Sequence, residues 1–301
     1  MSDFLFPTIE IILGVILLFA GGEFFIRGAI NLSLILGIPQ IVIGLTVVSL
    51  GTSSPELLVS LSSILKGSDS LAASNVIGSN IFNVLVVLGI SSLITPLKVK
   101  SRIVRRDVPL LMAISVAVWA MSSTGLLTFQ AGIFLIFCLV LNTIWEINTI
   151  NEKGDDTKDA EPEIEELNEN YKGKLNIVLK LILGIFLLSF GSNILVNGSQ
   201  TLATILGVNE IIIGLTIVAT GTSLPELVTS IIAALKGKTD LAIGNVIGSN
   251  LLNLYIFYIL DKILYLNRFN YLSELRIGLF IYFSLLTIFL FVQEKLKFSK
   301  S

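Results

Sequence analysis

The stretch GTSSPE at residues 51–56 recurs as GTSLPE at residues 221–226. Each copy places a glutamate, Glu56 or Glu226, deep inside a long apolar segment. An ionised side chain near the middle of a bilayer costs at least about 2.5 to 3.5 kcal/mol, so such residues usually face a protein interior and mark an ion or proton pathway. Two carboxylates at matched positions therefore predict a cation site.

The composition predicts a membrane setting for this site. The chain has 301 residues, of which 53% are hydrophobic and 14% charged, and its mean hydropathy is +0.88. This is far more apolar surface than one soluble core could bury, so we expect an all-α integral membrane protein. Nine apolar runs are close to the length of ~20 residues that a helix needs to cross ~30 Å of hydrocarbon. They are residues 8–28, 39–65, 70–94, 107–124, 127–147, 175–198, 209–235, 240–262 and 274–293.

The positive charges predict how these spans are oriented. With the N-terminus outside, fifteen of the 20 Lys and Arg residues fall in cytoplasmic loops, and Lys180 lies near the inner end of the sixth span. The external loops hold only four, which are Lys66, Lys262, Arg268 and Arg276. This bias predicts a multi-pass protein of the cell membrane with a cytoplasmic C-terminus. The formal net charge of -2 predicts no nucleic-acid partner.

An internal repeat with an offset of 170 residues organises the chain. Residues 43–83 and 213–253 are identical at 24 of 41 positions without a gap. We expect a first repeat of five spans in residues 1–150 and a second repeat of four spans in residues 175–301. Because five is an odd number, the second repeat would enter the membrane upside down, as in many secondary transporters. Residues 151–174 contain nine of the 22 acidic residues and predict a solvated cytoplasmic linker.

The GTSxPE element predicts a broken helix that presents oxygen atoms. Gly51 and Gly221 leave the backbone uncovered, and the following prolines remove amide donors, so carbonyls one turn earlier lose their helical partners. Irregular backbone at membrane depth is tolerated only where it is buried in protein or lines a cavity. Calcium takes six to eight such hard oxygen ligands. The candidates are the backbone at Ser49 and Ala219, the hydroxyls of Thr52, Ser53, Thr222 and Ser223, and the carboxylates of Glu56 and Glu226.

A second element, NVIGSNxxN, follows in each repeat and adds further polar side chains. It contributes Ser79, Asn80 and Asn83 in the first copy and Ser249, Asn250 and Asn253 in the second. Residues four apart share one face of a helix, so Ser79 with Asn83, and Ser249 with Asn253, project together and can face the opposing glutamate. Asn75 and Asn245, one turn earlier, are secondary candidates that we expect to bond helix to helix.

A purely structural interpretation competes with this one. A single GTSxPE segment could be a proline kink satisfied by a neighbouring helix, with a glutamate that merely packs against a hydroxyl. Two copies, each followed by an asparagine at the same 27-residue spacing, favour an ion site instead.

The two elements, their duplication and the acidic central loop resemble the calcium:cation antiporter superfamily, in particular its prokaryotic sodium/calcium exchanger branch. The resemblance covers residues 8 to about 260 and implies a ten-helix fold in which calcium and sodium compete for one cluster of sites, with the first and sixth helices sliding against the rest. It implies that Glu56 and Glu226 bind calcium and are shared with sodium. Thr52, Thr222 and the backbone at Ser49 and Ala219 match surrounding donors. Ser53, Ser223, Ser79 and Ser249 match sodium ligands, and Asn83 and Asn253 match the midplane positions.

The chain departs from the family pattern in two ways. Many exchangers have an aspartate where this chain has Asn253, so the expected site has two carboxylates and a fixed charge of about -2, which balances one calcium ion. After the ninth span the chain ends with QEKLKFSKS, so the tenth helix, the counterpart of residues 127–147, is expected to be missing.

These observations predict a secondary active antiporter rather than an enzyme, with Ca²⁺ and Na⁺ as transported ions, membrane lipid as surroundings and no cofactor. Calcium/proton exchange at the same glutamates is a close alternative, since buried carboxylates can take up protons. Two further functions compete with exchange, namely a passive cation channel and a non-transporting remnant that only binds calcium.

Overall fold

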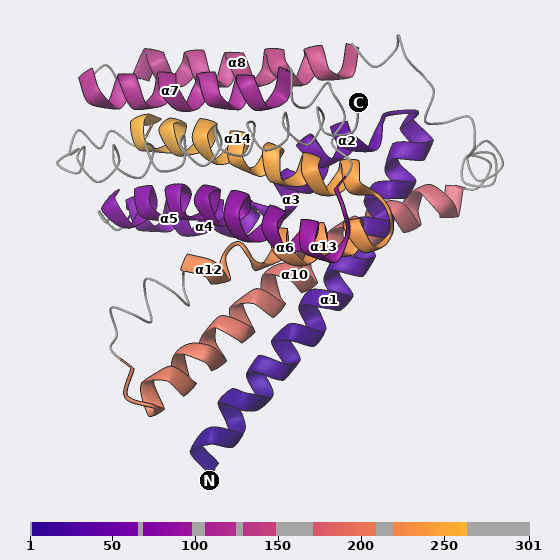
Figure 1. Cartoon of the computed structure of the whole chain (residues 1–301), viewed down its shortest axis with the longest axis vertical. Helices are drawn as coiled ribbons and strands as arrows, with labels where there is room; N and C mark the ends of the chain where they lie inside the picture. Colours follow the sequence, from indigo (N-terminus) through magenta and orange to yellow (C-terminus); the bar gives the residue numbers. More distant parts are fainter. Residues whose placement is uncertain are drawn as a thin grey trace.

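The computed structural model describes residues 2–65, 69–97, 106–124, 129–148, 171–208 and 219–263. Every regular element in these ranges is a helix, which agrees with the predicted all-α class (Figure 1). The acidic linker, residues 209–218 and the predicted span 274–293 lie outside the described residues.

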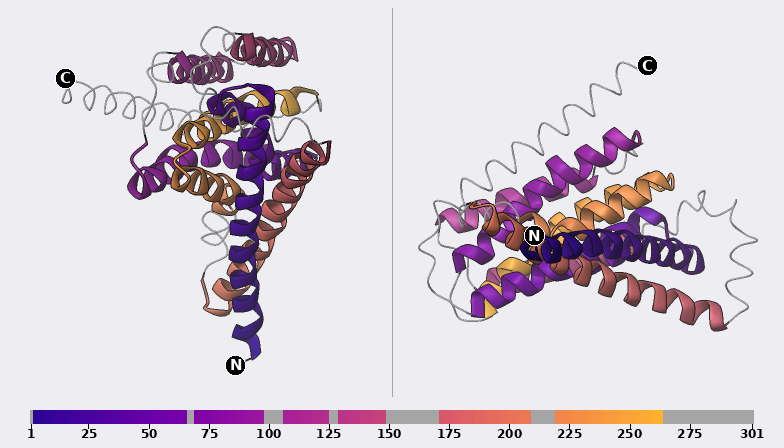
Figure 2. Two further views of the ribbon diagram at one scale, coloured as in Figure 1. Left: turned by 90° about the vertical axis from the view of Figure 1, so that its right-hand side faces the viewer. Right: turned by 90° about the horizontal axis from the view of Figure 1, so that it is seen from below.

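Two helices of 35 residues cross each other along one side of the molecule (Figures 1 and 2). They are α1 (Ser2–Leu36) and α10 (Tyr171–Ile205), each about 52 Å long at ~1.5 Å per residue. Both are longer than the apolar runs 8–28 and 175–198 that the sequence indicates, and the segments apolar enough to cross a membrane extend over Phe4–Leu36 and Lys174–Ile205. A helix of this length must tilt to fit the hydrocarbon layer.

The two long helices end at matched glycines. Gly37 and Gly207 have φ values of +62° and +74°, in the left-handed region that favours glycine. After Gly37, the amide of Ile38 donates to the carbonyl of Ser33 at 3.0 Å, which closes the last turn of α1. The same arrangement follows Gly207, so the repeat preserves the helix end as well as the motifs.

Glycines allow the backbones of α1 and α10 to touch. A Cβ atom at Gly14 would lie 2.6 Å from Cβ of Leu195, and one at Gly184 would lie 2.6 Å from Cβ of Phe25. Small residues permit this close packing of membrane helices. Six glycines at seven-residue spacing form this contact, three on each helix: Gly14, Gly21, Gly28, Gly184, Gly191 and Gly198.

The helix after α1 is broken at the GTSSPE segment. Its first part comprises α2 (Gln40–Ile43), the π-helical η1 (Gly44–Val48) and α3 (Ser49–Thr52), and its second part is α4 (Ser54–Leu65), bent by 43° from the first. In the second half α12 (Ala219–Gly221) and α13 (Leu224–Leu235) are interrupted at the same motif position. The predicted break at GTSxPE is therefore confirmed in both copies.

The remaining helices form layers around α14 (Thr239–Ile263). The pair α7 (Val108–Thr124) and α8 (Phe129–Asn148) packs on one side of α14, and α4 and α5 (Asp69–Phe82) pack on the other (Figure 1). After α5 the chain continues through the π-helical η2 (Asn83–Val87) into α6 (Leu88–Ile94). The corresponding residues 253–257 lie in the regular α-helix α14, so the two halves differ where their sequences diverge after the motif.

The surface of the long helices is apolar. Phe19 on α1 and Phe186 on α10 are 48% and 60% exposed, as expected for side chains that face lipid. Three described helices, Phe4–Leu36, Asn75–Ile94 and Lys174–Ile205, are long and apolar enough to cross a membrane, and the bent pair around Ser53 would make a fourth. The predicted number of nine spans stays a prediction, because residues 209–218 and 264–301 lie outside the description.

Candidate ion-binding site

Glu56 and Glu226 lie in the first turns of α4 and α13, directly after the two helix breaks. They are 1% and 0% exposed. The start of a helix carries a partial positive charge from its free amide groups, which favours a carboxylate at this position. The breaks therefore place two acidic side chains in the interior at the helix ends best suited to hold them.

Each glutamate is bound by a serine from the opposite half. The Ser53 hydroxyl donates to Glu226 Oε1 at 2.8 Å, and the Ser223 hydroxyl donates to Glu56 Oε1 at 3.1 Å. Ser223 is the N-cap residue of α13 but makes no capping bond with its side chain. An N-cap serine usually accepts a bond from an amide of its own helix. Here its hydroxyl is directed to the partner half instead.

The other oxygen of each carboxylate is buried and lacks a hydrogen-bond partner among the described residues. This is true of Oε2 of Glu56 and Oε2 of Glu226, and also of Oδ1 of Asn83. Buried polar atoms normally have partners, and an uncompensated buried charge is strongly destabilising. A cation or a proton at these oxygens would supply the missing partner.

Asn75 and Asn245 connect the broken helices to α5 and α14. Oδ1 of Asn245 accepts the hydroxyl of Thr52 at 3.0 Å, and Oδ1 of Asn75 accepts that of Thr222 at 3.3 Å. Their amide groups donate within their own halves, to Glu226 O at 3.4 Å and to Glu56 O at 3.3 Å. The predicted helix-to-helix role of both asparagines is confirmed.

Two asparagines from the second element of each repeat meet where α5 and η2 face α14. Asn83 Nδ2 donates to Asn250 Oδ1 at 3.0 Å, and Asn253 Nδ2 donates to Asn80 Oδ1 at 3.1 Å. The sequence analysis named Asn80 and Asn250 as polar side chains of the second element but did not place them among the candidate ligands. The sequence does contain a pattern that indicates their importance, because both belong to the duplicated GSN triplet and occupy equivalent positions in the 170-residue repeat.

The expected direction of the Ser–Asn pairs is wrong for the second half. Ser249 Oγ lies 3.5 Å from Glu226 Oε1, which is the glutamate of its own half. In the described part of the chain, Asn253 bonds to Ser79 Oγ at 3.1 Å rather than to a carboxylate, and Asn83 likewise bonds to an amide. The serines at the helix breaks take the cross-half bonds to the carboxylates instead.

The backbone at Ser49 also differs from expectation. Its carbonyl is not released by the break, because it accepts the amide of Ser53 at 2.9 Å. Pro55 removes only its own amide, whose helical acceptor would be the carbonyl of Gly51. Ser49 could still act as a backbone ligand, since a carbonyl oxygen has two lone pairs.

The second break distributes its backbone bonds differently. The Ser223 amide donates to Thr220 O at 3.1 Å, so it does not engage the carbonyl of Ala219, the first residue of α12. The carbonyl of Gly221, which lost its helical donor to Pro225, accepts the buried hydroxyl of Ser192 from α10. Sequence reasoning did not identify Ser192, whose mate in the first half is Gly22 and has no hydroxyl.

The site offers a cation hard oxygen ligands, and these ligands carry little fixed negative charge. Within the described ranges, no group of three or more His, Cys, Asp or Glu side chains is placed to hold a metal ion. The charge of the cluster therefore comes from two glutamates, and its other donors are neutral hydroxyl and amide oxygens. Such donors suit Ca²⁺ and other hard cations, and a pair of carboxylates balances one divalent ion.

Comparison with known proteins gives consistent results. The family model "Sodium/calcium exchanger protein" matches residues 6–147 and 176–299. The inner membrane protein YrbG of Escherichia coli is 36% identical over 84% of this chain and 78% of its own length. The sodium/calcium exchanger MaX1 of Methanosarcina acetivorans is 30% identical, over 85% of this chain and 82% of its own length.

The fold is also that of a solved structure. The sodium-calcium exchanger NCX_Mj superimposes with a TM-score of 0.79 and 23% identity, covering 96% of this chain and 90% of that protein. The fold and the site described above are those of a membrane protein with two matched halves. The chain belongs to the sodium/calcium exchanger family.

Proposed function

We propose that this protein is a secondary active antiporter that exchanges Ca²⁺ for Na⁺ across the cell membrane by alternating access. The observation that carries the proposal is the pair of buried glutamates, each bound by a serine of the opposite half while its second oxygen lacks a protein partner. The family membership and the name of MaX1 support the same conclusion.

Competition for two charges provides the coupling. The two positive charges of a calcium ion are balanced by both carboxylates together, whereas the single charge of a sodium ion is balanced by one carboxylate. Calcium and sodium ions therefore cannot occupy the cluster fully at the same time. A ligand shifts a conformational equilibrium only through its different affinity for the two states. Exchange then requires alternating access of one site and no covalent chemistry.

The proposed ligands are those that the sequence predicts, with the contacts above as support. Glu56 and Glu226 are the central ligands, and the donors around them are the hydroxyls of Thr52, Thr222, Ser53, Ser223, Ser79 and Ser249, the amide oxygens of Asn83 and Asn253, and the carbonyls of Ser49 and Ala219. Asn80 and Asn250 join the proposal as residues that position Asn83 and Asn253.

The proposed topology is an inverted repeat with its twofold axis at the site. Contacts between the halves are reciprocal: Ser53 bonds to Glu226 as Ser223 bonds to Glu56. Reciprocity of this kind is the property of a twofold arrangement. We therefore propose repeats in residues 1–150 and 175–301 joined by a cytoplasmic linker at 151–174, with the N-terminus outside and the C-terminus inside. The positive-inside bias supports this orientation.

Flux in proteoliposomes tests the counter-ion. The purified full chain is reconstituted, and calcium uptake is measured under an outward sodium gradient at fixed pH, under a pH gradient without sodium, and without any counter-ion gradient. We expect uptake only with the sodium gradient. Uptake under the pH gradient alone would favour proton exchange at the same carboxylates, and gradient-independent flux would indicate a channel.

A further inference from the structure

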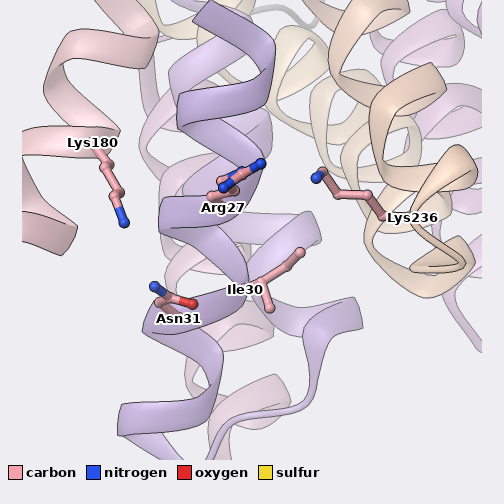
Figure 3. A pocket seen from close by; sticks show the side chains of 5 residues that line it. All are labelled: Arg27, Ile30, Asn31, Lys180 and Lys236. Atoms are coloured by element: carbon pink, nitrogen blue, oxygen red, sulfur yellow. The ribbon is translucent and has the colours of Figure 1, made fainter. Parts of the chain in front are cut away.

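A basic pocket of about 310 Å³ lies away from the ion site, where α1, α10 and the end of α13 meet (Figure 3). Arg27 comes from α1, Lys180 from α10, and Lys236 directly follows α13. The pocket is completed by Ile30 and Asn31.

The pocket has an excess of positive charge. Glu23 Oε1 accepts bonds from Arg27 Nε and, at 2.8 Å, from Lys236 Nζ. Within the described part of the chain no carboxylate is paired with Lys180, so three cations face one anion. Lys180 and Lys236 flank α1 on opposite sides, with Arg27 on α1 between them, and all three line the pocket (Figure 3). The cluster therefore keeps a net positive charge that an anionic group would reduce.

The fold does not need this charge, as the other repeat shows. In the 170-residue register the mate of Lys180 is Glu10, and the mate of Arg27 is Asn197. The glycine contact between α1 and α10 is nevertheless present at both ends of the pair. The basic cluster is therefore an addition to one end of a packing arrangement that forms without it at the other.

The surroundings of the pocket favour a lipid over a free ion. Next to Lys180 on α10, Leu179 and Ile182 are 54% and 60% exposed and offer an apolar surface for acyl chains. The distribution of Lys and Arg predicts that this end of α1 and α10 faces the cytoplasm, where leaflets carry anionic lipids. Basic pockets between helices on this side suit such headgroups.

We infer that this pocket binds the phosphate-bearing headgroup of an anionic lipid of the cytoplasmic leaflet. Its cations come from α1, from α10 and from the residue that follows α13, so the bound headgroup links α1 and α10 to the end of α13. Glu23 limits the strength of binding, because it already neutralises one charge shared by Arg27 and Lys236. This inference does not depend on which ions the protein transports.

Native mass spectrometry of the purified full chain tests the inference. The probe is phosphatidylglycerol, added to protein in a neutral detergent, and the readout is the fraction of protein that retains lipid. Each cation near an anionic surface contributes about 1 kcal/mol, so Lys180→Gln or Lys236→Gln should weaken retention about fivefold. Glu23→Gln should strengthen it by a similar factor. Lys174→Gln, an exposed change on the same helix outside the pocket, should match the wild type.

Three results would overturn the inference. The first is equal retention of phosphatidylglycerol by the wild type, Lys180→Gln and Glu23→Gln. The second is equal loss in Lys174→Gln and Lys180→Gln, which would indicate general surface attraction. The third concerns thermal stability: if inorganic phosphate stabilises the protein as much as phosphatidylglycerol does, in a way that depends on Lys180, then the pocket binds a free anion rather than a lipid.

Discussion

Replacing Glu56 or Glu226 by glutamine is expected to abolish calcium uptake driven by a sodium gradient. The change removes one of the two charges of the site and preserves the size of the side chain. The glutamine carbonyl can still accept a hydrogen bond from the hydroxyl of Ser223 or Ser53. In the wild type these hydroxyls donate to Glu56 at 3.1 Å and to Glu226 at 2.8 Å. Because a buried charge is removed and no cavity is made, the fold should persist.

The magnitude follows from the charge of the ion. At an effective dielectric constant near 20, two unit charges 4 Å apart interact by about 4 kcal/mol, so one carboxylate contributes about 8 kcal/mol to a divalent ion. If desolvation offsets half of this, removing the carboxylate costs about 4 kcal/mol and weakens calcium binding about 1000-fold. A monovalent ion loses about half as much, so the variant should favour sodium over calcium more than the wild type does.

The assay has two readouts. Uptake of radioactive calcium into sodium-loaded proteoliposomes measures exchange, and calorimetric titration of the purified protein with calcium measures affinity. Glu10→Gln is the matched control, because it makes the same chemical change in α1 outside the ion site. It should retain the flux and the calcium affinity of the wild type.

The reasoning would be refuted by a glutamine variant at either position that keeps wild-type flux and calcium affinity. A variant that binds calcium normally but does not exchange it would contradict the charge argument in particular. Its carboxylate would then be needed for the conformational step rather than for binding.

Other changes test the surroundings of the carboxylates. Ser53→Ala and Ser223→Ala each remove a hydrogen bond to a charged group, so calorimetry should show calcium binding weakened about 10- to 100-fold, to a similar degree for both variants. The exposed Ser62→Ala should leave affinity unchanged and is their control. Gly184→Ala forces a Cβ into the contact between α1 and α10 and should destabilise the protein by about 1 to 3 kcal/mol, seen as a lower melting temperature in detergent. Asn245→Ala leaves buried partners of its amide unpaired and should lower the melting temperature by a similar amount, and unchanged stability would show that these bonds are not needed.

The sequence was sufficient to predict the helix breaks and the residues that meet there. Glycine followed by proline around Glu56 indicates a break at membrane depth, and the constant register shows that a second break accompanies it. The register also predicts that Asn75 and Asn245 play matched roles, which the structure confirms. These features depend on local chemistry and on symmetry, both of which the sequence displays directly.

The bonds between the halves could not be predicted, because they depend on how α14 is rotated about its axis. That rotation is determined by packing: a Cβ at Gly248 would lie 2.5 Å from the carbonyl of Leu45, and one at Gly244 would lie 2.5 Å from the carbonyl of Ile41. These backbone contacts hold α14 against α2 and η1 and direct Ser249 to the glutamate of its own half. The helical spacing predicts that Ser249 and Asn253 share one face of α14, but it does not predict which residues of the neighbouring helices that face contacts.

The cross-half bonds also determine when the site can exist during synthesis. The hydrogen bond between Glu56 and Ser223 can form only after 167 further residues have been synthesised, and the bond between Thr52 and Asn245 only after 193 further residues. At about 5 to 20 residues per second, translation of such an interval takes roughly 8 to 40 seconds. Throughout that time the nascent first half holds a carboxylate at membrane depth without the hydroxyl that will bind it. The first half alone therefore lacks part of the ion site until the second half has been synthesised.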